Sequence, residues 1–208
     1  MTEVIREENP ESPETAALII NKGGTIVYPT ETLYGLGANA LSEISVRRVF
    51  IVKSRPHGKP IPVLVKDIEM FHEVANVTEQ ASKLIDRFLP GALTLVLNQR
   101  IKFPDLITAD TGKVAVRISS HPFVKRLFNY ISQPLTATSA NISGRDNLYD
   151  LNDIIDAFRS KVDLIIDSGS LPPSKGSTVV DLTKTPPSII REGEISRELI
   201  EGFFKWLA

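Results

Sequence analysis

The residues with the clearest chemical potential form a basic turn, Lys53-Ser-Arg55-Pro-His-Gly-Lys59-Pro60. Residues 44–66 include several lysines and arginines and no acidic residue, although the net charge of the whole chain is only −1. The prolines and the glycine of this turn restrict its backbone and bring Arg55 close to Lys59. A planar arginine fork beside a lysine point charge is suited to clamp a polyphosphate. A solvated basic helix end followed by a turn is the alternative interpretation.

Three further polar groups stand near apolar, strand-like runs, where the small-molecule sites of α/β sheets usually form. Pro29-Thr-Glu-Thr32 follows one such run, and small hydroxyl and amide side chains fill residues 136–144. A capped turn and a plain polar loop are the alternatives for these two groups. The third group is Arg117, which interrupts the apolar run 114–118. A guanidinium there must meet an anion to offset its desolvation, and that anion is either a ligand or the carboxylate of a structural ion pair.

The composition excludes several kinds of chemistry. The chain has no cysteine, which removes disulfides, thiolate nucleophiles and cysteine-based metal sites. Its histidines, His57, His72 and His121, lack metal-ligand spacing, so we predict no metal-binding residues and expect any metal to arrive with a substrate. No P-loop motif is present, and residues 35–40 match a dinucleotide fingerprint only in letters. No carboxylate pair is assigned to acid–base work.

The length and the apolar pattern predict the elements that must position these residues. The 208 residues, of which 42% are hydrophobic and 24% charged, fit a single domain over residues 1–208 with a packed core. Helices are predicted over 12–22, 42–55, 68–74, 78–88, 122–130, 151–158 and 196–207, and strands over 25–28, 61–65, 93–97, 114–118, 135–137, 163–166, 178–182 and 189–191. Residues 33–37, 138–148 and 169–177 are predicted as loops, the last of them mobile.

Helices and strands alternate, but several strands follow one another directly, which predicts a mixed sheet of the α/β or α+β class. The acidic N-terminus has no apolar signal segment, and no apolar run approaches the roughly 18 residues that span a bilayer. We therefore expect a cytoplasmic protein without a membrane partner.

Six motifs in one order resemble those of the YrdC-like threonylcarbamoyl-AMP synthases. They are Tyr28-Pro-Thr-Glu-Thr-Leu-Tyr-Gly-Leu36, Lys53-x-Arg55-Pro-x-x-Lys59-Pro60, Val116-Arg117, Ser139-Ala-Asn141-x-Ser-Gly144, Ser177-Thr-Val-Val-Asp181 and Ile190-Arg191-x-Gly193. The resemblance extends from about residue 16 to residue 193. It implies an α/β fold with a twisted mixed sheet and flanking helices around a concave positive cavity. The longer family members carry an additional C-terminal domain, and this chain resembles the short single-domain form.

The resemblance also implies a role for each matched residue. Lys53, Arg55 and Lys59 would form the catalytic cluster, with Arg55 and Lys59 on the phosphates of ATP. The other nucleotide contacts would be Ser139, Asn141, Asn147 and Arg191, and the threonine contacts Thr32, Arg117 and Ser177. In this assignment Arg117 pairs with the carboxylate of threonine, which would explain an arginine in an apolar strand. Two positions depart from the family pattern: Leu64 replaces a frequent histidine, and Asn147 replaces a frequent serine.

The implied reaction makes threonylcarbamoyl-AMP from L-threonine, bicarbonate and ATP, with Mg²⁺ brought by ATP and pyrophosphate released. Its product would serve the threonylcarbamoyl modification of tRNA adenosine through a downstream transferase. The enzyme would need no nucleophile of its own, because it mainly aligns the reactants and stabilises negative charge. Two alternatives remain: an RNA-binding module, or an enzyme that forms another carbamoyl-adenylate. RNA is therefore a further candidate partner.

Overall fold

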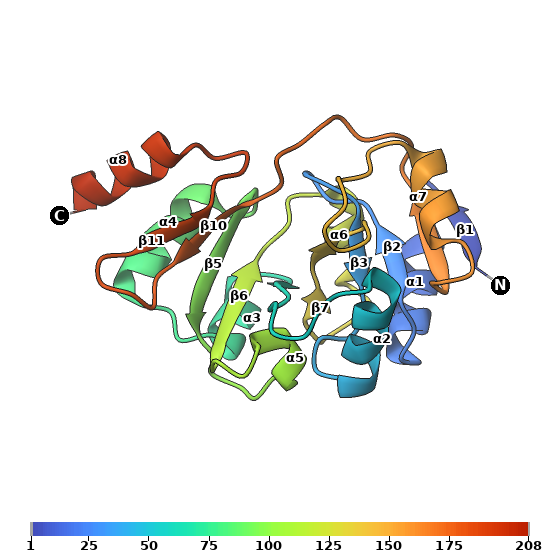
Figure 1. Ribbon diagram of the computed structural model, residues 1–208, viewed down its shortest axis with the longest axis horizontal. Coiled ribbons are helices and arrows are strands. Elements are labelled where there is room, and N and C mark those ends of the chain that lie inside the picture. Colours follow the sequence, from blue (N-terminus) through green and yellow to red (C-terminus); the bar gives the residue numbers. More distant parts are fainter. Residues whose placement is uncertain (1, 208) are drawn as a thin grey trace.

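The strands assemble into two mixed β-sheets, which lie side by side in Figure 1. The computed structural model describes the backbone of residues 2–207 and the side chains of residues 2–205. The first sheet has the order β1-β9-β2-β3-β8. Its strands are β1 (Glu3–Arg6), β9 (Leu164–Asp167), β2 (Ile26–Tyr28), β3 (Gly35–Gly37) and β8 (Thr138–Ser139). β1 and β2 run parallel to β9, while β3 runs antiparallel to both β2 and β8.

The second sheet has the order β11-β10-β5-β6-β4-β7. Its strands are β11 (Ser188–Arg191), β10 (Thr178–Asp181), β5 (Leu93–Asn98), β6 (Lys113–Arg117), β4 (Val63–Leu64) and β7 (Leu135–Thr136). Parallel pairing joins β10 to β5 and β4 to β6, and the remaining neighbours are antiparallel. The prediction of a mixed α/β fold is therefore confirmed, with the strands divided between two sheets.

Thr136 forms hydrogen bonds that join the two sheets. Its hydroxyl accepts from the backbone N–H of Ala38 and donates to the carbonyl of Leu36, each at 2.9 Å. Its own N–H donates to the carbonyl of Ala38 at 2.9 Å, and its carbonyl accepts from the Tyr28 hydroxyl at 3.0 Å. Because Thr136 is fully buried, these bonds satisfy polar groups that would otherwise be costly, and they fix the relative position of β3 and β7.

Helices flank both sheets (Figure 1). They are α1 (Ser12–Asn21), α2 (Glu43–Lys53), α3 (Ile68–Val74), α4 (Glu79–Phe88), α5 (Asp105–Thr108), α6 (Pro122–Leu127), α7 (Leu151–Phe158) and α8 (Arg197–Leu207). Several begin with a side chain that accepts a hydrogen bond from the first turn, as Ser42, Asp67, Thr78 and Asp150 do. Such caps satisfy backbone N–H groups that have no partner within the helix. Among residues 2–207 no helix combines the length and the apolar character needed to cross a membrane.

Three strands were not predicted from the sequence, namely β1, β3 and β8. β1 lies in the acidic N-terminal segment, and β3 lies where a loop was expected. β3 consists of two glycines around a leucine, a composition with low strand propensity. The ring of Tyr28 occupies the space that side chains would need, because a Cβ on Gly35 or Gly37 would lie only 2.8 Å or 2.7 Å from that ring. Glycine therefore allows β3 to pair closely with β2.

Smaller differences concern the ends of elements. The helix predicted over 122–130 ends at Leu127, and the loop predicted over 138–148 begins with β8. The short helix α5 was not predicted. The core is nevertheless built from the predicted apolar runs, and strands such as β2, β9 and β5 are buried along most of their length. These buried strands position the polar groups at the junction of the two sheets.

Candidate active site

A polar pocket lies at the junction of the two sheets. The first sheet and its turns contribute Tyr28, Thr30, Thr32, Leu33, Tyr34, Gly35, Thr138 and Ser139, and the second sheet and its connections contribute Pro62, Leu64, Thr94, Arg117, Ala137, Lys175, Gly176, Ser177 and Arg191. Arg55 and Asn147 complete the lining from two loops. The lining described by the structure thus has three arginines, one lysine and no carboxylate. Such a pocket attracts anions although the chain as a whole has a net charge of −1.

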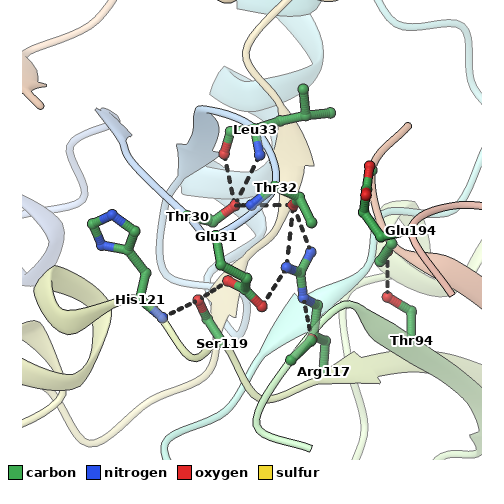
Figure 2. A network of polar contacts seen from close by, with 12 residues as sticks. Thr30, Glu31, Thr32, Leu33, Thr94, Arg117, Ser119, His121 and Glu194 are labelled. Atoms are coloured by element: carbon green, nitrogen blue, oxygen red, sulfur yellow. Dashed lines mark hydrogen bonds and ion pairs between the residues drawn. The ribbon is translucent and has the colours of Figure 1, made fainter. Parts of the chain in front are cut away.

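Arg117 lies at the end of β6, and its guanidinium binds three partners (Figure 2). Nε donates to the carbonyl of Gly91 at 3.0 Å, and Nη1 and Nη2 both donate to the hydroxyl of Thr32, at 3.2 and 3.1 Å. Nη2 also forms an ion pair with Oε1 of Glu31, at 2.6 Å. An ion pair within the protein, which the sequence left open as an alternative, is therefore present. Arg117 nevertheless lines the pocket.

Glu31 is held from behind by Ser119. The serine hydroxyl donates to Oε2 of Glu31 at 2.5 Å, and the same hydroxyl accepts from the N–H of His121 at 3.2 Å (Figure 2). Burial alone would raise the pKa of Glu31, but the charge of Arg117 and hydrogen bonds from Arg117 and Ser119 keep this pKa below its ordinary value. Glu31 is therefore a carboxylate at neutral pH, and it compensates the positive charge of Arg117.

Thr30 orders the turn that presents Thr32. Its hydroxyl donates to the carbonyl of Leu33 at 2.7 Å and accepts from the N–H groups of Thr32 and Leu33, each at 3.2 Å. A turn closed by a threonine hydroxyl in this way fixes the backbone locally. The hydroxyls of Thr30 and Thr32 also lie 3.1 Å apart. The turn thus holds the Thr32 hydroxyl against the guanidinium of Arg117.

Ser177 lies directly before β10, beside β5, which pairs with the strand that carries Arg117. Its hydroxyl lies 2.8 Å from that of Thr94 on β5, and Nη2 of Arg191 donates to it at 3.2 Å. Nε and Nη2 of Arg191 also donate to the carbonyl of Ser177, at 3.1 and 2.7 Å. Arg191 therefore fixes the backbone of Ser177 while its own charge lines the pocket.

The loop over residues 169–177, which we predicted to be mobile, is fastened at its C-terminal end. Oε1 of Glu194 accepts from the hydroxyl of Ser174 and from the N–H of Lys175, both at 2.7 Å. The carbonyl of Gly176 accepts from the N–H of Glu194 at 2.9 Å. A Cβ on Gly193 would lie 2.2 Å from that carbonyl, so only glycine permits this approach. The loop thereby presents Lys175 to the pocket.

Arg55 reaches the pocket from the basic turn after α2. Its Nε donates to the carbonyl of Lys59 at 3.1 Å, and its Nη2 donates to the carbonyl of Pro60 at 2.8 Å. These bonds close the turn, as its prolines and glycine suggested. The side chain of Lys59 is exposed and does not line the pocket in this structure.

Lys53 points into the protein instead of into the pocket. It is only 1% exposed, and its ammonium donates to the carbonyls of Ser139 and Asn141, the latter at 2.7 Å, and to Oδ1 of Asn141 at 3.2 Å. Burial, with a smaller effect of the nearby Arg55, lowers the pKa of Lys53 to about 7. Oδ1 of Asn141 also accepts from the Ser139 hydroxyl at 2.6 Å. Lys53 and Asn141 therefore support Ser139 from behind the pocket wall.

The structure thus gathers most of the residues singled out from the sequence. Thr32, Arg55, Arg117, Ser139, Asn147, Ser177 and Arg191 line one pocket, whereas Lys53, Lys59 and Asn141 do not. Leu64, one of the two departures from the family pattern, lines the pocket as well.

Thr30, one of the hydroxyls singled out in Pro29-Thr-Glu-Thr32, also lines the pocket, whereas Tyr28, Thr94 and Lys175 were not assigned to the site. Glu31, which does not line the pocket but pairs with Arg117, was missed too. Thr94 had a sequence signal, since it is a lone hydroxyl within the apolar run 93–97.

Comparison with known proteins agrees with this fold. The sequence model of the Sua5/YciO/YrdC family, described as "Telomere recombination", matches residues 18–193. The chain therefore belongs to this family, and the resemblance drawn from the motifs is confirmed.

Particular relatives agree in sequence and in structure. A threonylcarbamoyl-AMP synthase of Pyrococcus abyssi is 40% identical over 89% of this chain and 55% of its own length. A relative from Methanocaldococcus jannaschii, whose name assigns the same activity provisionally, is 37% identical over 93% of this chain and 91% of its own length. The crystal structure of P. abyssi Sua5 complexed with L-threonine superposes with a TM-score of 0.90 at 38% identity, covering 97% of this chain and 60% of that one. The chain thus spans little more than half of the Pyrococcus protein.

Proposed function

We propose that this chain is an L-threonylcarbamoyladenylate synthase, a nucleotidyltransferase that converts L-threonine, bicarbonate and ATP into threonylcarbamoyl-AMP, pyrophosphate and water. The observation that supports this most is the pocket with four cationic side chains and no carboxylate, on a fold shared with a protein crystallised with L-threonine. The product carries the threonylcarbamoyl group in activated form, suited to a transferase that modifies tRNA adenosine.

The threonine end of the pocket in this proposal comprises Thr32, Arg117 and Ser177. Arg117 binds the carboxylate of the amino acid, for which a guanidinium fork is the matching donor. Two of its N–H groups now converge on the Thr32 hydroxyl, so a carboxylate there joins or replaces that contact. The paired hydroxyls of Ser177 and Thr94 face the same space and supply partners for the threonine hydroxyl.

The nucleotide end in this proposal lies around Arg55, Arg191, Ser139 and Asn147. Arg55 and Arg191 carry positive charge for the phosphates, and Ser139 and Asn147 supply short polar contacts to the nucleoside. Lys59 extends from the same turn as Arg55 and adds its charge from the solvent side. Lys53 and Asn141 act on this end indirectly, because their hydrogen bonds fix the position of Ser139.

The proposed chemistry asks the protein to align reactants. The amine of threonine adds to carbon dioxide formed from bicarbonate, and one oxygen of the resulting N-carboxylate forms a bond to the α-phosphorus of ATP. The bond from that phosphorus to the bridging oxygen breaks, and pyrophosphate leaves with its electron pair. Preorganised cations that stabilise the developing charge are sufficient for such a step.

Mg²⁺ enters this proposal as part of the ATP substrate. Among the residues whose side chains the structure describes, no group of three or more His, Asp or Glu could hold a metal ion. The lining residues supply no carboxylate ligand, so they fit a metal carried by phosphate oxygens and water better than a protein-bound one. We propose a cytoplasmic location, where ATP, tRNA and the downstream transferase are present.

The decisive experiment incubates the protein with MgATP, L-threonine and bicarbonate, measures pyrophosphate, and identifies the adenylate by mass spectrometry. Pyrophosphate should require threonine and bicarbonate together, because the attacking carboxylate forms only from both. Release of the same amount without threonine refutes the proposal. Carbamoyl phosphate in place of threonine and bicarbonate tests the other carbamoyl-adenylate activity. Binding of tRNA with a steep salt dependence and no turnover would instead support the RNA-binding alternative.

A further inference from the structure

Glu31 is a partly buried carboxylate next to Arg117, at the amino-acid end of the pocket. It pairs with Arg117 at 2.6 Å, and the side chains of the two residues are only 18% and 9% exposed. Glu31 does not line the pocket, whereas Arg117 does. The carboxylate therefore acts on a ligand through Arg117 and through its charge.

The hydrogen bonds of Arg117 show which side it offers to a ligand. The Nε proton is bound to Gly91, and Nη2 is shared between Glu31 and Thr32. Among the described residues Nη1 donates to Thr32 alone, so the second of its two protons is left for a ligand. Glu31 and Gly91 thus fix the plane of the guanidinium, and because Arg117 and Thr32 both line the pocket, we expect Nη1 and the Thr32 hydroxyl to meet a ligand.

Charge differs between the two ends of the pocket. Arg55 at the nucleotide end forms no ion pair with a described carboxylate, and Arg191, which reaches from that end to the Ser177 hydroxyl, forms none either. At the amino-acid end Glu31 cancels the charge of Arg117. A polyanion is therefore attracted to the first end, while a phosphate beside Arg117 would meet the repulsion of Glu31.

We propose that Glu31 is a positioning and specificity-determining residue that keeps the Arg117 end of the pocket selective for a zwitterionic amino acid over phosphate. The net charge of the Arg117–Glu31 pair is zero. A zwitterion has no net charge, so its binding does not require a net positive charge at this end of the pocket. A phosphate dianion would be attracted by an unpaired arginine, and Glu31 removes that attraction. The pair therefore favours the amino acid over phosphate at one end of a continuous pocket. Such a site disfavours the wrong ligand as well as binding the right one. This inference rests on the proposed function.

The test is Glu31→Gln, which keeps the size and an acceptor oxygen but removes the charge. Titration calorimetry without ATP gives the Kd of L-threonine, and displacement of threonine by inorganic phosphate gives the Kd of phosphate at the same end. In the variant, threonine should bind several-fold more weakly and phosphate more tightly, so that the ratio of their affinities shifts at least tenfold toward phosphate. In turnover assays the KM for threonine should rise with that Kd, while the KM for ATP stays within about twofold.

Two further variants separate charge from packing. Glu7→Gln is the control, because the Glu7 side chain is 16% exposed, pairs with Arg126 at 3.5 Å and does not line the pocket; it reaches Glu31 only indirectly, through His121, which lies 3.9 Å from Glu7 and binds Ser119. It should affect stability without moving the threonine-to-phosphate ratio. Ser119→Ala removes the hydrogen bond that holds Glu31 but leaves its charge, so it should weaken threonine binding and leave phosphate excluded. If Glu31→Gln does not fold, Glu31→Met takes its place, because it also removes the charge; Glu31→Asp, which keeps the charge, should leave phosphate excluded.

An unchanged affinity ratio in Glu31→Gln, with only a lower melting temperature, overturns the inference and leaves Glu31 a structural residue. A shifted ratio in Glu7→Gln overturns it as well, because loss of any buried carboxylate would then suffice. Failure of the proposed function gives a different result, since the unmodified protein would then release no threonine-dependent pyrophosphate.

Discussion

Lys53 gives a pH-dependent prediction that can be worked out from its burial. The ammonium lies behind the pocket wall, with oxygen atoms of Ser139 and Asn141 as its partners and no carboxylate ion pair. Desolvation, with a smaller contribution from Arg55, lowers its pKa to about 7 from an ordinary value of 10.5. The folded protein therefore binds this proton more weakly than the unfolded chain does.

The sign of the effect on stability follows from this difference. Below pH 7 both states hold the proton, so the group adds no pH dependence there. Between pH 7 and pH 10.5 the unfolded chain keeps a proton that the folded protein has lost, so stability rises with pH. The slope approaches about 1.4 kcal/mol per pH unit, and the contribution grows by about 3 kcal/mol between pH 6 and pH 9.

Urea unfolding of the unmodified protein and of Lys53→Met at a series of pH values measures this contribution. Other titrating groups are shared, so the difference between the two unfolding free energies isolates Lys53. This difference should shift in favour of the unmodified protein as the pH rises from 6 to 9. Lys59→Met, at an exposed lysine of the following turn, controls for loss of a surface charge. A difference that stays constant over this range would refute the argument and show that the buried ammonium stays charged.

Three further predictions concern the pocket. Arg55→Ala should raise the KM for ATP about ten- to hundredfold, because a charge-assisted contact is lost. The rise should be smaller for Lys59→Ala, because the Lys59 side chain is exposed and its charge is screened. Steady-state kinetics with ATP varied measures both, and equal KM values in the unmodified protein and the two variants would move the phosphate site elsewhere. Arg117→Lys keeps the charge but removes the planar fork, so it should raise the KM for threonine strongly and change ATP affinity little; loss of thermal stability with an unaltered threonine KM would contradict the substrate role. Gly193→Ala should lower the melting temperature and weaken both substrates, since its Cβ would collide with the carbonyl of Gly176; calorimetry and kinetics that match the unmodified protein would disprove the need for this close approach.

Arg117 shows what the sequence could and could not predict about the site. An arginine in an apolar strand requires an anionic partner, and that requirement was correct. The identity of the partner depends on which turn folds over the end of β6, and Glu31 stands 86 residues earlier in the chain. Its neighbours Thr30 and Thr32 drew attention as hydroxyls, while the glutamate between them had no partner visible along the sequence.

The sequence already contained a pattern that places Lys53 on the buried face of α2. On α2 the residues Val46, Val49, Phe50 and Lys53 share one face, and the first three are buried. The helical period therefore places Lys53 on the buried face as well, in spite of its charge. Its position within a basic stretch suggested a phosphate contact instead. Helical periodicity was the better guide to where this ammonium points.

β3 shows the same limit for the fold. Strand propensities come from side chains, and Gly35-Leu36-Gly37 offers only one large side chain. The strand forms because the ring of Tyr28 covers both glycines and because Thr136 of the other sheet binds its backbone. Both causes are tertiary, so local sequence patterns could not reveal them. The apolar runs of β5 and β9, in contrast, were predicted because burial on both faces leaves a local pattern, and β6, which has one half-buried face, was predicted from its valines and the isoleucine that follows them.

The junction of the two sheets also explains how a chain of net charge −1 can maintain a cationic pocket. The seam at Thr136 holds the sheets together through hydrogen bonds between neutral groups, so no carboxylate is needed at the junction. Arg191 and Arg55 each donate hydrogen bonds to backbone carbonyls. These bonds orient the guanidinium groups without neutralising them. Arg117 alone among these arginines is oriented by a carboxylate as well. Carbonyls orient all three arginines, and Glu31 pairs with Arg117 alone, so the pocket keeps its cations and has a neutral pair only at the end where we propose that the amino acid binds.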